Sequence, residues 1–241
     1  SDGNGAGDFS IGTSTTLSTG NNSLTLTANE IDILGTISSG TGSTTIAVSD
    51  GGTIGLGGTS GNMTITDAEL SKITAGTLNI GNSSTGNITV DGISAANSDN
   101  VGTVNLTTAS GSSVSFSNND STFNALAVNG GSTSFGNGLT IATDTGKFSL
   151  NSSAITSEGA LALTGATGID FGAGVVFTGG GDVSMSTNSG DLVGAGAFTL
   201  TSTGNISLSE NLTTAGTTVI ATDSDGNGAG DFSIGTSTTL S

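Results

Sequence analysis

Short runs of alternating apolar and polar residues recur along this chain at intervals of about 20 residues. In residues 24–37, LTLTANEIDILGTI, the apolar side chains occupy every second position in two successive runs. Residues 161–175 and 198–212 repeat this arrangement at nearly the same spacing. A period of two predicts strands with one buried face, and the Gly, Asn, Ser, Thr and Asp residues between the runs predict turns. The chain is therefore predicted to be all-β.

Eleven such units fit into positions 1–223 when the first strand of each unit is followed along the chain, which gives about 20 residues per unit. The first strands are expected to begin near Leu24, Ile46, Met63, Leu78, Val104, Leu126, Leu139, Leu161, Val183, Phe198 and Val219. A unit this short cannot bury its apolar face alone, but it can close one turn of a solenoid and stack on its neighbours. We therefore predict a parallel β-helix (β-solenoid) of about 11 coils.

The same eighteen residues, SDGNGAGDFSIGTSTTLS, occupy positions 1–18 and 224–241. Identity over eighteen positions indicates a tandem repeat that starts at Ser1 and starts again at Ser224. We expect residues 1–241 to form one continuous solenoid segment, made of one repeat (1–223) and the first eighteen residues of the next. Both copies should then form the same coil and bury the same apolar side chains, which are Phe9, Ile11, Phe232 and Ile234.

The residue types agree with such a coil. The 42 glycines suit tight corners, and the absence of proline suits strands that are paired on both edges. The main alternative is a string of immunoglobulin-like sandwiches, which usually carry a core Trp or Tyr and repeat at longer intervals. The chain has neither aromatic residue. Residues 67–73 are the one segment that suits a helical turn, and a corner loop fits them equally well.

Two stretches resemble a known family. Residues 75–117 (AGTLNIGNSSTGNITVDGISAANSDNVGTVNLTTASGSSVSFS) and 159–187 (GALALTGATGIDFGAGVVFTGGGDVSMST) are similar to the repeat regions of filamentous-haemagglutinin-like bacterial exoproteins. These are very large surface adhesins, often exported by two-partner secretion. The resemblance extends over nearly the whole chain. It implies a right-handed parallel β-helix on a bacterial surface, and it carries no catalytic residues across.

The chain is strongly acidic, with 19 acidic residues, two lysines (Lys72 and Lys147) and a net charge of −17. It contains no basic cluster that could neutralise phosphates, which argues against nucleic acid and anionic membranes as partners. No apolar run is long enough to insert into a membrane. Cations are the natural counter-ligands of such a chain, and the lack of cysteine excludes disulfide bonds.

The segment DSDGNGAGD matches most of a calcium-binding loop of the form D-x-[DN]-x-[DN]-G. Ligand positions 1, 3, 5, 7 and 9 of that loop correspond to Asp223, Asp225, Asn227, Ala229 (through its carbonyl) and Asp231. Position 12, which should be a bidentate Glu, is Ile234. The sequence thus predicts a weak calcium site, and an acidic glycine-rich turn that holds no ion remains the alternative.

Catalysis is not expected. Lyases and hydrolases built on solenoids use paired carboxylates or a calcium ion beside a strong base, and this chain has no His, Arg, Cys or Tyr. Two carboxylate pairs remain, Glu30/Asp32 and Asp67/Glu69. Residues two apart on a strand share its outer face, so we expect these carboxylates to be solvated.

Two other polar patterns have simple interpretations. Thr-x-Thr pairs occur at Thr25/Thr27, Thr64/Thr66 and Thr199/Thr201, and stacked pairs of this kind could order water and bind ice. Units that carry Asn or a single Thr interrupt them, so the array is expected to be broken. The Asn-x-Thr sequences at Asn62, Asn87, Asn105 and Asn211 are interpreted as turns and ladders.

The predicted function is structural: a repeat unit of an extracellular stalk, filament or adhesin on a bacterial cell surface. Its expected partners are neighbouring repeats end to end, like chains in a filament, and a host or neighbouring cell surface. A calcium-dependent or ice-binding surface module is the alternative. A carbohydrate-active β-helix enzyme is a second and weaker one.

Overall fold

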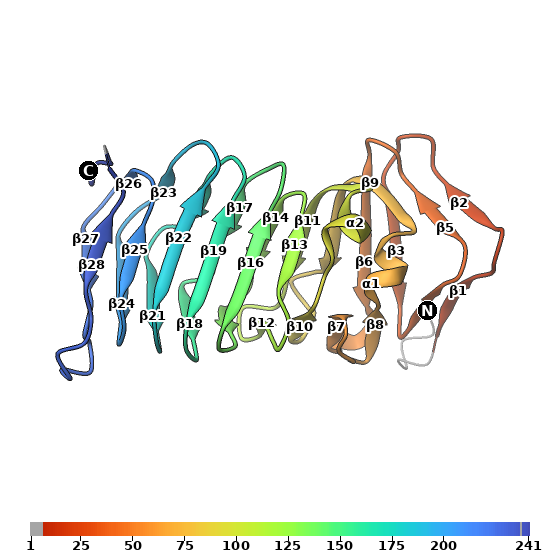
Figure 1. Ribbon diagram of the computed structural model, residues 1–241. Coiled ribbons are helices and arrows are strands. Elements are labelled where there is room, and N and C mark those ends of the chain that lie inside the picture. Colours follow the sequence, from red (N-terminus) through yellow and green to blue (C-terminus); the bar gives the residue numbers. More distant parts are fainter. Residues whose placement is uncertain (1–6, 237) are drawn as a thin grey trace.

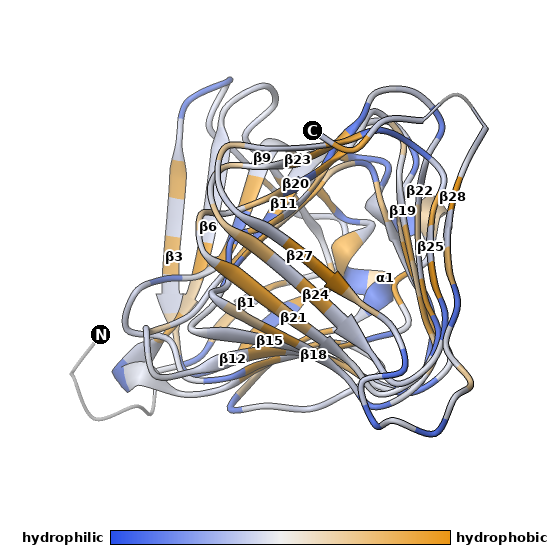
Figure 2. Cartoon of the chain, turned by 90° about the vertical axis from the view of Figure 1, so that its left-hand side faces the viewer, coloured by the Kyte–Doolittle hydropathy of each residue, from blue (hydrophilic) through white to orange (hydrophobic). Residues whose placement is uncertain are grey.

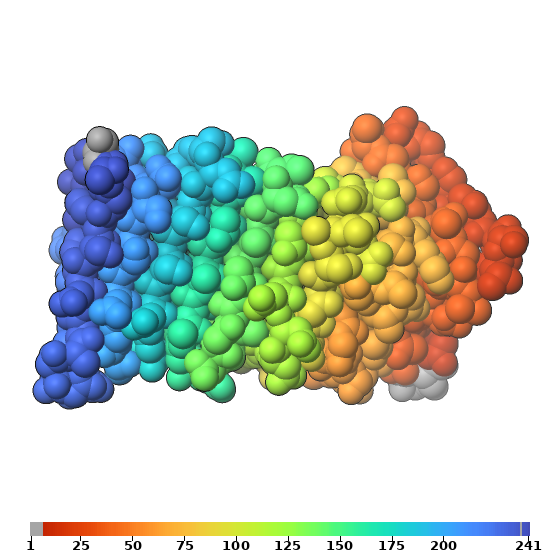
Figure 3. Space-filling model, viewed as in Figure 1, coloured from red at the N-terminus to blue at the C-terminus, as the bar shows by residue number. Residues whose placement is uncertain are grey.

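The computed structural model describes residues 7–236 and 238–241, and it is a parallel β-solenoid (Figure 1). The chain winds through about ten turns of about 22 residues, so the predicted fold class is confirmed with slightly fewer and longer coils than expected. The coils stack as one unbroken rod in the space-filling view (Figure 3).

Three long parallel sheets form the sides of the solenoid, and we number them by size. Sheet 1 contains β2 (Thr16–Ser18), β5 (Thr36–Ser38), β9 (Ile73–Gly81), β11 (Val101–Thr107), β14 (Leu126–Asn129), β17 (Phe148–Leu150), β20 (Ile169–Phe171), β23 (Leu192–Gly194) and β26 (Leu212–Thr214), with β3 (Leu24–Ala28) and β6 (Ser43–Val48) joined to it through β9. Sheet 2 contains, from the C-terminal end, β27 (Thr218–Ala221), β24 (Phe198–Ser202), β21 (Val175–Gly179), β18 (Ala154–Ser157), β15 (Ser132–Phe135), β12 (Ser113–Phe116), β10 (Ile88–Asp91), β7 (Ile54–Gly57) and β8 (Met63–Ile65).

Sheet 3 is shorter, because it begins only in the middle of the chain. It contains β13 (Ser121–Phe123), β16 (Leu139–Thr143), β19 (Leu161–Gly165), β22 (Val183–Thr187), β25 (Ile206–Leu208) and β28 (Phe232–Ile234). A separate two-stranded sheet pairs β1 (Phe9–Ile11) with β4 (Ile31–Ile33) near the N-terminus. The short helical segments are a 3₁₀ turn (Ser49–Gly51), α1 (Asp67–Leu70) and α2 (Ala95–Ser98).

The sequence overcounted the coils because one turn holds strands of more than one sheet. Leu126 pairs with Phe148 in sheet 1, whereas Leu139 pairs with Leu161 in sheet 3. Leu126 and Leu139 therefore mark two sides of one turn, although they were expected to start separate coils. Short alternating strands look alike whichever side they form, so sequence spacing alone could not separate the sides.

Coil length changes along the solenoid. In the C-terminal half the turns are short, and Leu192 pairs with Leu212 of the next turn. Near the N-terminus Thr44 pairs with Leu78, which lies much further along the chain, because this turn also contains β8 and α1. A helical turn at residues 67–73 is thus confirmed for Asp67–Leu70, while α2 was missed.

Apolar and polar residues alternate along the strands (Figure 2), and the apolar side chains are buried in the interior of the solenoid. Nearly all are less than 5 % exposed. Parallel, in-register stacking places like side chains above each other, so the rings of Phe116 and Phe135 stack with centroids 5.1 Å apart. Phe171 and Phe198, from different sheets, contact each other across the interior at 4.7 Å.

Asn and Asp side chains link successive coils at the corners. In each link the side-chain Oδ1 accepts the backbone N–H of a residue in the next coil, at 2.7–3.1 Å. The acceptor and donor pairs are Asn21 and Thr41, Asn87 and Ser113, Asp120 and Thr140, Asn137 and Ala160, Asp182 and Asn205, Asn205 and Asp231, and Asn211 and Thr239. Ladders of amides, such as Asn79 with Asn105 at 2.9 Å, add to them on the sheets. The interpretation of the Asn-x-Thr sites as turns and ladders is confirmed for Asn87, Asn105 and Asn211.

Substitutions of two neighbouring residues of β21 test whether its side chains alternate between the interior and the outer face. Phe177→Ala should lower the free energy of unfolding by about 3–5 kcal/mol, because Phe177 is fully buried and its removal leaves a cavity. Val176→Ala should change it by less than about 0.5 kcal/mol, because Val176 is 48 % exposed. Denaturant titration of both variants measures the difference. Equal losses would contradict the assigned register.

Candidate functional site

The predicted calcium loop is an exposed turn between β27 and β28. Asp223 is half-buried and has a positive φ of 53°, and both of its carboxylate oxygens accept the backbone N–H of Gly228, at 2.9 and 3.0 Å. The Nδ2 of Asn227 donates to Asp225 at 2.9 Å, and the Oδ1 of Asn227 accepts the N–H of Ala229 at 2.9 Å. The polar side chains of the loop thus bind the loop itself.

Asp231 takes part in a corner ladder instead. Its backbone N–H donates to Asn205, whose own N–H donates to Asp182 in the coil before. Asp231 therefore continues the series Asp182–Asn205–Asp231, in which the first two side chains each accept an N–H from the following coil. The sequence analysis missed this role because the three positions are unevenly spaced along the chain, and their alignment is visible only once the coils are in register.

The structure brings Asp223, Asp225 and Asn227 into one loop, but it does not gather the carboxylates. Among the residues that the structure describes, no group of three or more His, Cys, Asp or Glu side chains could hold a metal ion. The loop residues that could supply oxygen ligands are the same ones that were named from the sequence. Two of them, Ala229 and Asp231, are exposed to solvent. The calcium site stays a prediction.

Three of the four carboxylates in these pairs, Glu30, Asp67 and Glu69, accept hydrogen bonds where β8 and α1 interrupt the regular strand ladder. Glu30 Oε1 accepts the N–H of Thr64 at 2.8 Å, and Glu69 Oε1 accepts the N–H of Ile33 at 2.9 Å. Glu69 also completes a capping box with Thr66 at the start of α1. The expectation of simply solvated side chains on a strand was therefore wrong for Glu30, Asp67 and Glu69, because unpaired backbone N–H groups need acceptors and Asp67 and Glu69 lie on α1.

Asp67 and Lys72 extend this network. The carboxylate of Asp67 accepts the backbone N–H and hydroxyl of Ser94, at 3.0 and 2.9 Å, and the amide of Asn97 at 2.6 Å. These contacts join α1 to the start of α2. Lys72 Nζ donates to the carbonyl of Ile33 at 2.8 Å. Side chains thus hold together three successive coils that lack a regular backbone ladder on this side.

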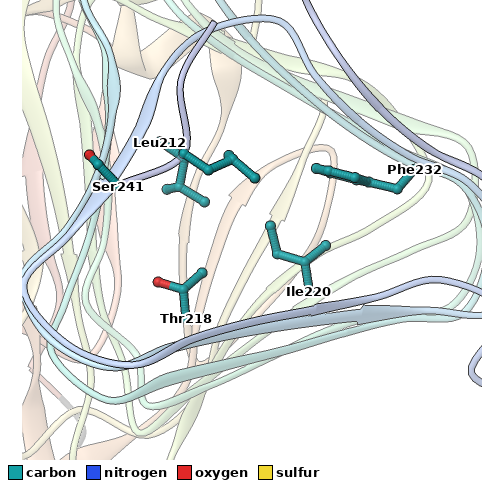
Figure 4. A pocket seen from close by; sticks show the side chains of 6 residues that line it. Leu212, Thr218, Ile220, Phe232 and Ser241 are labelled. Atoms are coloured by element: carbon teal, nitrogen blue, oxygen red, sulfur yellow. The ribbon is translucent and has the colours of Figure 1, made fainter.

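The C-terminal end of the solenoid is an open apolar recess of about 420 Å³ (Figure 4). It is lined by Leu212, Thr218, Ile220, Phe232, Leu240 and Ser241. Phe232 and Ile234 are 41 % and 43 % exposed, whereas Ile11 in the N-terminal copy is only 4 % exposed. The expectation of equal burial was wrong: β1 is covered by the following coil, whereas β28 pairs with the preceding coil and its apolar side chains stay exposed.

The two identical segments nevertheless form the same local structure. Each makes a strand from its FSI residues, β1 and β28, and each turns after the following glycine. The N–H of Thr15 donates to the carbonyl of Gly12 at 3.2 Å, and the N–H of Thr238 donates to that of Gly235 at 3.4 Å. After the turn, the N-terminal copy continues into β2 of sheet 1. In the C-terminal copy, Leu240 forms a β-bridge with Leu212 of the same sheet. β28, however, closes sheet 3, whereas β1 pairs with β4 alone.

The outer face of sheet 2 carries an uninterrupted column of hydroxyl groups. The residues in register on six successive strands are Thr89, Ser115, Ser134, Thr156, Thr178 and Thr201. The Thr-x-Thr pairs picked out in the sequence lie on β3, at the end of β8 with Thr66 capping α1, and on β24, and they do not stack on each other. A periodic array therefore exists, but Thr201 is its one member from those pairs, and sequence spacing did not connect the others.

Among the described residues, three acidic side chains belong to strands, Asp32, Asp91 and Asp170, and the others lie in turns and helical segments. Lys147 pairs with Asp170 at 2.8 Å on the surface, where such a pair adds little stability. Partial burial and the nearby charge of Asp99 raise the pKa of Asp144. In the described residues no helix is of the length and apolarity that crossing a membrane requires.

The calcium prediction is tested by melting the protein in millimolar calcium and in chelator, because an ion bound to the folded state raises the melting temperature. Calcium should raise it for the unchanged protein and not for Asp225→Ala. Asp170→Ala, on sheet 1, is the matched control and should keep the calcium effect. Identical melting curves with and without calcium would reduce the loop to an ordinary turn.

Comparisons of the chain with protein-family models, curated proteins and solved structures gave no match.

Proposed function

We propose that this chain is a structural segment of an extracellular bacterial stalk or adhesin, in which tandem copies of residues 1–223 continue one solenoid. The observation that carries the proposal is the pair of identical segments that begin and end the chain. Both form a strand and a hydrogen-bonded turn of the same kind, and one of them is covered by the next coil. A continuous rod requires that each copy of the repeated segment forms the same local structure and can be covered by the coil that follows it.

The geometry supports a load-bearing or spacing role. From β2 to Leu240, sheet 1 advances through nine ladder steps, by way of β5, β9, β11, β14, β17, β20, β23 and β26. At about 4.8 Å per step, one repeat adds about 43 Å to the rod. The net charge of −17 on the chain keeps such rods soluble, because rods of like charge repel one another. The resemblance to filamentous-haemagglutinin-like exoproteins supports the placement at a bacterial surface.

The stalk is tested by joining a second copy of the repeat directly to the chain. Small-angle scattering should show a single stiff rod that is longer by about 43 Å. A matched chain with a flexible Gly/Ser linker between the repeats should instead give two rods that move independently. If the direct fusion scatters like the linked one, the solenoid does not continue across the repeat boundary.

A water-ordering or ice-binding surface is a second candidate, favoured by the hydroxyl column of sheet 2. Its six Ser and Thr residues stand about 4.8 Å apart, with none missing. Replacing Thr156 and Thr178 by Lys should abolish inhibition of ice recrystallisation if the column binds ice. The same change at Ser149 and Thr213 of sheet 1 should leave inhibition intact. An unchanged protein without any inhibition eliminates this candidate.

A further inference from the structure

The loop between β27 and β28 contains an Asn–Gly pair, Asn227–Gly228. In such a pair the backbone nitrogen of the glycine can attack the side-chain carbonyl of the asparagine and close a cyclic imide, because glycine has no side chain that hinders the approach. The loop lies at the lower left of Figure 1, and both residues are exposed to water. The contacts that bear on this reaction all lie within residues 223–229, so they need no neighbouring coil.

The attacking nitrogen already has a base beside it. The backbone N–H of Gly228 must lose its proton for the attack, and it donates to both carboxylate oxygens of Asp223 at 2.9 and 3.0 Å. A carboxylate at hydrogen-bond distance from the proton that moves can accept this proton as a general base. Asp223 is therefore positioned to activate the nitrogen of Gly228.

The side chain of Asn227 is held in a position that suits the attack. Its Oδ1 accepts the N–H of Ala229 at 2.9 Å, which folds the side chain back over Gly228 and brings its Cγ towards the glycine nitrogen. The same hydrogen bond stabilises the negative charge that develops on Oδ1. The leaving nitrogen, Nδ2, donates to Asp225 at 2.9 Å. The loop thus binds the nucleophile, the carbonyl oxygen and the leaving group.

The structure describes two other Asn–Gly pairs, which begin at Asn129 and Asn137, and their side chains bind the next coil instead. The Oδ1 of Asn137 accepts the N–H of Ala160 at 3.0 Å, and the N–H of Gly138 donates to the carbonyl of Ala160 at 2.7 Å. The Oδ1 of Asn129, on β14, accepts the Nδ2 of Asn151 at 2.9 Å. At Asn137 a neutral carbonyl thus takes the place of the carboxylate, and at both sites the amide is tied to another coil.

We propose that Asn227 is a site of self-catalysed deamidation, with Asp223 as the base. Asp223 takes the proton from the nitrogen of Gly228, this nitrogen forms a bond to Cγ of Asn227, and the bond from Cγ to Nδ2 breaks. Nδ2 leaves as ammonia with the proton that Asp223 accepted. Water then opens the cyclic imide at either carbonyl and leaves aspartate or isoaspartate at position 227. This modification goes beyond the proposed stalk and does not depend on it.

The product changes the loop. A carboxylate at position 227 cannot donate to Asp225, where Nδ2 of Asn227 donates now, and the two like charges repel each other. The loop should therefore open once the amide is lost. The modification thus alters the segment that carries the calcium prediction, and it adds one negative charge to the chain.

Mass spectrometry of the aged protein tests the site. Cleavage after the two lysines separates the pairs, since residues 148–241 contain Asn227–Gly228 alone and residues 73–147 contain the other two described pairs. After incubation of the folded chain near neutral pH, the amide-to-acid mass increase should appear several-fold sooner at position 227 than at Asn129 or Asn137. Incubation in denaturant should remove most of this difference, because the loop contacts are then lost. Equal rates in the folded protein would contradict the proposal.

Asp223→Asn tests the role of the base. Asparagine also tolerates the positive φ of this position and can accept the N–H of Gly228, but its neutral amide is a far weaker base than a carboxylate. The variant should slow deamidation at position 227 several-fold, with fragment spectra used to assign the modified residue. Asp231→Ala is the matched control, because it removes a nearby carboxylate that does not bind this N–H, and it should keep the rate. An unchanged rate in Asp223→Asn, or an equal loss in both variants, would overturn the proposal.

Discussion

Each coil of this protein is too thin to bury its own apolar side chains, and the whole structure depends on that constraint. A turn of about 22 residues supplies only a few inward side chains, such as Leu126, Val128 and Leu139 in one coil. They leave water only when the coils on both sides cover them. Stability is therefore a property of neighbouring coils, and Phe232 and Leu240, in the last coil described, are much more exposed than the apolar side chains between two coils.

The same constraint explains the polar design of the corners. Parallel pairing satisfies the backbone within the sheets, but the corners leave N–H groups free, and Asn and Asp side chains accept them from the adjacent coil. Where the regular ladder is interrupted, carboxylates take over. Glu30, Asp67 and Glu69 accept backbone N–H groups there, which explains why several acidic residues of this chain have structural roles.

The repeated eighteen-residue segment shows which sequence can cover the last coil of this solenoid. An uncovered end normally needs a polar cap, because its strand edge and apolar interior are open. Here the open end, with Ile220 and Phe232, carries the sequence that the N-terminal coils already cover at Phe9 and Ile11. The molecule thus contains both the last strand and, around Phe9 and Ile11, a coil that covers the same sequence, as the proposed continuation of the rod requires.

The sequence by itself determined the architecture. Alternation of apolar residues, frequent turns, the lack of proline and the short period were enough to predict a parallel solenoid, because each of these features acts within a single coil. Only the tertiary structure decided which strands share a side, since Leu126 and Leu139 look equivalent until their partners Phe148 and Leu161 are known. For the same reason the sequence identified the acidic loop at Asp223 and Asp225, but it could not show the ladder that contains Asp231 or the hydroxyl column through Thr156. Those features join residues from different turns, and their alignment depends on turn lengths that vary along the chain with insertions such as β8 and α1.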